Sequence, residues 1–112
     1  VAGTNGQLLK YNHNYIGINQ LNSEVPEKFM LYQNYPNPFN PLTKIRFDVP
    51  QSGILLIRIY DVTGKVILSE SIQKNAGSYE FTFNGSTFAS GIYFYSGETG
   101  GRVSVKKMML IK

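Results

Sequence analysis

Few side chains in this sequence could take part in acid–base or nucleophilic chemistry. The 112 residues include one histidine, seven acidic residues and no cysteine. His13 lies in an asparagine-rich stretch with no acidic residue nearby, so it lacks the partner that a nucleophile–base pair requires. A solvent-exposed histidine is the simpler interpretation.

The acidic residues are scattered along the chain. Asp48, Asp61, Glu70, Glu80 and Glu98 fall on different predicted strands or turns, mostly at outward positions. Hydrolysis of a glycoside needs two carboxyl groups that converge in a cleft. A calcium loop needs a dense run of Asp and Asn ligands. The sequence shows neither pattern, so we expect no enzyme, no bound metal and no cofactor.

The composition predicts one β-rich domain. At 112 residues, 42% hydrophobic and 16% charged, the chain is long enough for one domain with a core and too short for two ordinary domains. Eight tyrosines and seven phenylalanines beside eleven glycines and five prolines favour strands and turns over helices. The net charge of +4 comes without an arginine-rich run, so we expect no nucleic-acid partner. No apolar run reaches the roughly 20 residues of a transmembrane segment.

Hydrophobic alternation defines the expected strands. In residues 43–49, Ile45, Phe47 and Val49 share one face, as in a half-buried strand. The run Asp61-Val62-Thr63-Gly64 has the chemistry of a hairpin turn, because Asp binds nearby backbone amides and Gly accepts positive φ. We therefore predict an all-β fold, an antiparallel immunoglobulin-like β-sandwich of about seven strands. The expected strands are residues 29–33, 43–49, 54–60, 65–72, 78–84, 91–98 and 102–111.

The sequence divides into three parts. Residues 1–22 are polar, with one short strand candidate at 7–11, and are interpreted as the tail of an upstream domain or a linker. Residues 23–28, with the sequence SEVPEK, are typical of a linker. Residues 29–112 form the predicted sandwich.

The stretch YPNPFNP, residues 35–41, is the most unusual local feature. Its three prolines fix their own φ angles and bias the preceding residues away from helix. Phe39 offers one large apolar anchor, and Asn37 and Asn40 can bond to nearby backbone. We interpret the stretch as a rigid corner. A proline-rich ligand for an aromatic groove is the alternative, but such ligands usually lie in polar, disordered surroundings.

Five segments carry a resemblance to a known family. LYQNYPNPFNPLTKIRFDVP, IYDVTGKVI, AGSYEFTFNG, SGIYFY and KKMMLIK, in this order, resemble the C-terminal sorting domain (type A) of the type IX secretion system of Bacteroidetes, the Por secretion tail family. The resemblance covers about residues 27–112. It implies a non-catalytic, immunoglobulin-like secretion signal that is covalently linked to an upstream cargo domain.

The resemblance also implies roles for individual residues. The family's motifs fall on Pro36, Asn37 and Pro38, on the turn of Asp61, Gly64 and Lys65, on Gly91 and Tyr93, and on a basic end. With the rest of the corner, the structural motif comprises Pro36, Asn37, Pro38, Phe39, Asn40, Pro41, Asp61, Gly64, Lys65, Gly91 and Tyr93. The implied partners are the outer-membrane secretion machinery and a sortase-like protease that cuts in the linker. The implied location is the cell surface or the exterior, reached through the periplasm and outer membrane.

The basic end is the predicted sorting signal. Its apolar residues form a strand flanked by lysines, which by itself fits a final strand whose charges protect an edge. An edge strand also presents unpaired backbone groups that a receptor can bind by strand addition. The predicted signal comprises Lys106, Lys107, Met108, Met109, Leu110, Ile111 and Lys112.

Rows of aromatic residues raise one alternative function. Tyr79, Phe81 and Phe83 share a face that is best explained as core. Tyr93 and Tyr95 share another, and exposed tyrosine rows stack on sugars in some sandwiches. An immunoglobulin-like module that binds carbohydrate or a surface partner is therefore the alternative.

Overall fold

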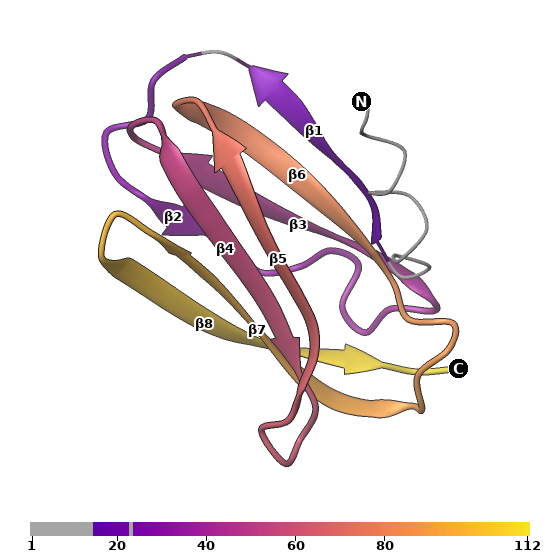
Figure 1. Ribbon diagram of the computed structural model, residues 1–112. Helices are drawn as coiled ribbons and strands as arrows, with labels where there is room; N and C mark the ends of the chain where they lie inside the picture. The colour runs from indigo at the N-terminus through magenta and orange to yellow at the C-terminus, as the bar shows by residue number, and fades with distance from the viewer. Residues whose placement is uncertain (1–14, 23) are drawn as a thin grey trace, which may run out of the picture.

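The protein folds as two antiparallel β-sheets packed face to face (Figure 1). The structure is a computed structural model and describes residues 15–22 and 24–112. The strand candidate at residues 7–11 and His13 lie outside the described residues. No helix long and apolar enough to cross a membrane occurs in the part of the chain that is described.

The first sheet has the strand order β1-β6-β3-β2. Its strands are β1 (Tyr15–Asn22), β2 (Met30–Leu31), β3 (Leu42–Val49) and β6 (Gly77–Asn84). β3 and β6 form its centre and pair over their whole lengths. β2 contributes only two pairs at the edge of β3, whereas β1 follows β6 on the other side with irregular register near both ends.

The second sheet has the strand order β5-β4-β7-β8. Its strands are β4 (Gly53–Tyr60), β5 (Val66–Lys74), β7 (Gly91–Thr99) and β8 (Arg102–Leu110). Every residue of β7 pairs with one of β8, from Gly91 with Leu110 to Thr99 with Arg102. β5 and β8 are the two edge strands. The connectivity of the two sheets is of the immunoglobulin class, in agreement with the predicted fold.

The inward faces of the two sheets form one core. The alternation of β3 buries Ile45, Phe47 and Val49, and that of β6 buries Phe81 and Phe83, as the sequence predicts. Because successive side chains of a strand point to opposite faces, each central strand contributes one apolar row, and β2, β8 and residues Phe29 and Phe39 complete the interior. The buried apolar residues are Phe29, Leu31, Phe39, Ile45, Phe47, Val49, Leu55, Ile57, Ile59, Tyr79, Phe81, Phe83, Tyr93, Tyr95, Met108 and Leu110.

The seven strands expected from residue 29 onward all form, and one further strand precedes them. β1 lies in the region that the sequence interprets as a tail, and it pairs with β6. Gly17, Asn19 and Gln20 interrupt the apolar pattern of β1, which pairs with the backbone of β6 and packs Ile18 against the core. The boundary at residues 23–28 remains a proposal.

Candidate recognition surface: the proline segment and the last strand

Phe39 anchors the proline segment, residues 35–41, in the core. Its ring is 1% exposed and meets Phe83 edge-on, with the ring centroids 6.0 Å apart. Gly85 leaves room for this packing, because a Cβ there would lie 3.2 Å from Cε2 of Phe39 and 3.0 Å from Cδ2 of Leu110. Phe39 is therefore packed inside the sandwich although it belongs to a loop.

The proline segment is hydrogen-bonded directly to the end of β8. The Phe39 amide donates to the Met109 carbonyl at 2.9 Å, and the Ile111 amide donates to the Phe39 carbonyl at 2.9 Å. The side-chain Oδ1 of Asn37 accepts from the Met109 amide at 3.0 Å. Figure 1 shows the β2–β3 connection passing beside the yellow end of the chain. The proline segment and the basic end thus form one surface.

Asn34 and Thr43 close the base of the proline segment. Asn34 is 2% exposed, and its Nδ2 donates to Oγ1 of Thr43 at 2.9 Å and to the Pro36 carbonyl at 3.1 Å. Thr43 Oγ1 also donates to the Pro36 carbonyl at 2.9 Å. Neither residue is in the predicted site. The sequence could have indicated Thr43, because the alternation of residues 43–49 places it on the core face with Ile45. A buried hydroxyl needs a hydrogen-bond partner.

Tyr95 fixes the chain just before the proline segment. Its hydroxyl donates to the Tyr32 carbonyl at 2.7 Å and accepts from the Asn34 amide at 2.8 Å. Burial raises the pKa of Tyr95 to about 12, because the ionised phenolate would be poorly solvated there. Tyr95 therefore connects β7 to the entry of the corner.

The predicted signal residues divide between the core and the surface. Met108 and Leu110 are 1% and 0% exposed and pack inside the sandwich. Met109 and Ile111 are 38% and 48% exposed, and Lys107 is also exposed. This second group, together with the exposed Lys112, is available to a partner through its side chains.

The lysines of the basic end differ in their environments. Lys106 is half-buried and faces inward opposite Tyr95, whereas Lys107 lies opposite Phe94 on the outer face. Lys112 donates from Nζ to the Ser86 carbonyl at 2.6 Å. None of the three forms an ion pair with another described residue. Their positive charges are therefore not neutralised locally.

A shallow groove lies between the proline segment and the outer face of β8. Its volume is about 240 Å³, and it is lined by Asn37, Pro38, Ile92, Lys107, Met108 and Met109. The lining is mainly apolar with one cation at its rim. Such a groove suits an extended segment with an apolar side chain and an adjacent acidic group.

Asp61 lies in the turn between β4 and β5, which is separate from this surface. Oδ1 of Asp61 accepts from the amides of Thr63 at 2.9 Å and Lys65 at 3.0 Å. Gly64 has φ of 90°, a conformation that favours glycine. The hydrogen bond from the Thr63 hydroxyl, with those from the two amides, lowers the pKa of Asp61. Asp61, Gly64 and Lys65 thus shape the β4–β5 hairpin.

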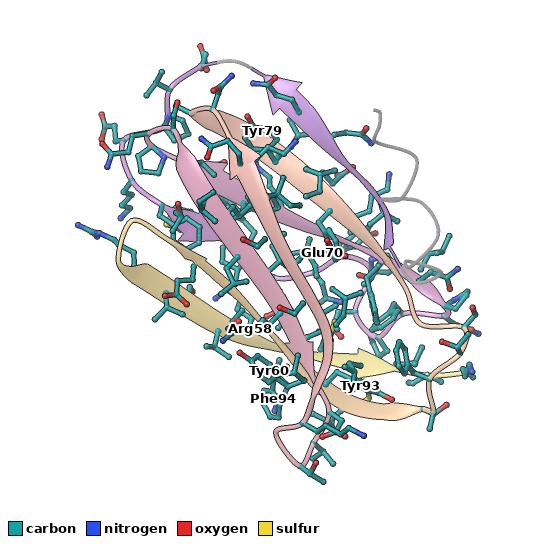
Figure 2. All side chains as sticks on the ribbon, viewed as in Figure 1. Arg58, Tyr60, Glu70, Tyr79, Tyr93 and Phe94 are labelled. Carbon is teal, nitrogen blue, oxygen red and sulfur yellow. The ribbon has the colours of Figure 1, made fainter. Side chains whose placement is uncertain are left out.

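Tyr93 closes the β6–β7 connection. Its hydroxyl donates to the Ala89 carbonyl four residues earlier at 2.6 Å, the arrangement known as a tyrosine corner in immunoglobulin-like domains. Gly91, at φ of 152°, starts the strand that carries it. Tyr79 makes the same contact with the Asn75 carbonyl at 2.7 Å. Figure 2 shows Tyr79 and Tyr93 at opposite ends of the sandwich.

The structure contradicts the tyrosine row as a sugar-stacking platform. Tyr93 is 7% exposed and Tyr95 is 0% exposed, so neither ring offers a free face. Tyr93 and Tyr95 do share one face of β7, but that face points into the core. Within the described residues, no three His, Cys, Asp or Glu side chains come close enough together to hold a metal ion.

Fold and surface together define an immunoglobulin-like β-sandwich whose proline corner is bound to its basic last strand. Residues 33–112 match the family model described as the secretion system C-terminal sorting domain, Por_Secre_tail. The chain belongs to this family, the sorting domains of the type IX secretion system. No curated protein sequence matches the chain.

Proposed function

We propose that this chain is a non-catalytic sorting module that directs an attached cargo protein through the type IX secretion system to the cell surface or the exterior. The family match carries this proposal, because it extends from the entry of the proline segment to the end of the last strand. The hydrogen bonds between Phe39, Met109 and Ile111 support it by joining the two regions into one exposed surface.

The exposed residues of the basic end are the proposed reading surface. Lys107, Met109 and Ile111 are accessible, and Lys106 and Lys112 add positive charge beside them. Met108 and Leu110 serve the same signal indirectly, because their burial fixes the strand that presents the others. The proposed partner is the outer-membrane secretion machinery, with acidic groups opposite the lysines.

The linker is the proposed site of processing by a sortase-like protease. Val25 is 67% exposed between β1 and β2, so its backbone is open to a protease. A cut here would leave β2 to β8 intact and separate them from β1 and the cargo. Mass spectrometry of the exported cargo would identify the new end, and a cut within β2 to β8 would contradict this proposal.

Surface transport of a reporter tests the sorting function. The 112-residue chain is fused behind an export leader and a reporter in a host that carries the type IX apparatus, so that β1 is retained. We expect the reporter at the cell surface or in the medium. Retention of the folded fusion in the periplasm would contradict the proposed function.

The signal itself requires substitutions rather than a deletion. Removing residues 108–112 would also remove Met108 and Leu110 from the core and unfold the domain. The triple variant Lys107→Gln, Met109→Ser and Ile111→Ser changes only exposed side chains. We expect it to fold normally and to lose surface transport. The matched control Val62→Ser and Lys65→Gln alters exposed residues of the Asp61 turn and should be transported normally.

A further inference from the structure

One part of the β8 edge has no partner within the described chain. Toward the end of β8, the Lys107 carbonyl accepts from Nε2 of Gln33, the Met109 amide donates to Asn37, and the Met109 carbonyl accepts from the Phe39 amide. Just after β8, the Ile111 amide donates to the Phe39 carbonyl. In an antiparallel strand, the backbone N–H and C=O groups of every second residue point to the same side of the strand. The N–H and C=O groups of Val103 and Val105 therefore also point away from β7, and no described residue bonds to them there.

The same edge carries only positive charge. β8 has the sequence RVSVKKMML, with Arg102, Lys106 and Lys107 and no acidic residue. None of the three cations is in an ion pair with another described residue. Val103 and Val105, between them, are 63% and 58% exposed. The open edge is therefore a short run of free backbone groups with apolar side chains and uncompensated cations.

We propose that the edge from Val103 to Lys107 binds an extended acidic segment of the secretion machinery by β-strand addition. The backbone of the added strand would bond to Val103 and Val105, and its acidic side chains would lie beside Lys106 on the inward face or beside Lys107 on the outer face. This proposal rests on the proposed sorting function and specifies the partner of that surface.

The occupant is acidic rather than a second copy of this chain. Two copies joined antiparallel along this edge, with Val103 of each opposite Val105 of the other, would place Arg102 of each opposite Lys106 of the other. Lysines on an edge strand are a common device against such self-association. The edge is already occupied from the Lys107 carbonyl onward by Gln33, Asn37 and Phe39, which also fixes where an added strand must stop.

Binding of two designed peptides to the 112-residue chain tests β-strand addition by an acidic segment. One capped heptapeptide alternates glutamate with valine, and the other alternates lysine with valine. We expect only the acidic peptide to bind, with protection of the Val103 and Val105 amides from hydrogen exchange and weaker binding at high salt. Equal binding of both peptides, or perturbation confined to other strands, would overturn the proposal.

A proline substitution tests the backbone contact. Val105→Pro removes an outward N–H and should weaken binding of the acidic peptide by about tenfold or more. Ser71→Pro is the matched control, because Ser71 occupies the corresponding outward position on the opposite edge strand, β5. Thermal unfolding of both variants establishes that each is folded. Unchanged peptide binding by a folded Val105→Pro variant would overturn strand addition.

Reporter export separates this proposal from the sorting function. Loss of export with Val105→Pro but not with Ser71→Pro supports both. Normal export of Val105→Pro, together with retention of the triple variant at Lys107, Met109 and Ile111, would leave the sorting function intact and refute strand addition. Failure of the unmodified fusion to reach the surface would refute the sorting function itself. Dimerisation of the chain that Val105→Pro abolishes would replace the acidic partner with a second copy.

Discussion

Replacing Phe39 with alanine should destabilise the sandwich strongly, although Phe39 lies in a loop. The ring is 1% exposed and packs against Phe83 at a centroid distance of 6.0 Å. Truncation of a buried phenylalanine to alanine costs about 3–5 kcal/mol through lost burial and the cavity that remains. At about 4 °C per kcal/mol for a domain of this size, the melting temperature should fall by about 12–20 °C.

Urea unfolding followed by far-ultraviolet circular dichroism measures this loss. Tyr35→Ala is the matched control, because Tyr35 belongs to the same segment and is 79% exposed. It should change the free energy of unfolding by less than about 0.5 kcal/mol. Hydrogen exchange should also show faster exchange of the Ile111 amide in Phe39→Ala, because its acceptor is the Phe39 carbonyl. A loss below about 1 kcal/mol for Phe39→Ala would refute the anchor role.

Three further changes test other parts of the same structure. Asn34→Ala removes the bonds to Thr43 and Pro36 and should cost about 1–3 kcal/mol in urea unfolding; no loss would mean that water replaces them. The pKa of Tyr95 is about 12 in the folded state, above its ordinary value, so Tyr95 contributes stability that is present below pH 10 and lost as pH rises toward 12. Tyr95→Phe should therefore lose less stability than the parent chain over that range, and an identical alkaline profile would contradict this. The pKa of Asp61 is lowered, so its contribution is present at neutral pH and lost as pH falls below its unfolded value. The difference in stability between the parent chain and Asp61→Ala should shrink in acid, and a difference that is constant with pH would contradict the assigned cause.

The sequence predicted the strands because each carries its own evidence. In β3 the alternation of Ile45, Phe47 and Val49 predicts which face is buried. The Asp61 turn indicates where the chain reverses after β4. The same alternation also placed Tyr93 and Tyr95 on one face. It could not state that this face points inward, because a row of tyrosines fits either a wet surface or a core with bonded hydroxyls.

The contact between the proline segment and β8 was not predictable from local patterns. Asn37 and the Met109 amide are 72 residues apart in the sequence. Nothing in either segment specifies the other, because the Phe39 bonds to Met109 and Ile111 join main-chain groups that every residue carries, and the Asn37 side chain bonds to a main-chain amide of the same kind. β1 escaped prediction for the same reason, since it is held by pairing with β6. Asp48 was expected on an outward face of β3. It is nevertheless buried there, because the hydroxyls of Tyr32 and Ser78 donate to its carboxylate at 2.6 and 2.7 Å.

Reporter transport by the exposed-face variant tests the central claim most directly. The account predicts that the fusion carrying Lys107→Gln, Met109→Ser and Ile111→Ser melts within a few degrees of the parent chain and stays in the periplasm, while the parent fusion reaches the surface. Equal surface transport of the folded variant and the parent would contradict the claim that these side chains carry the signal.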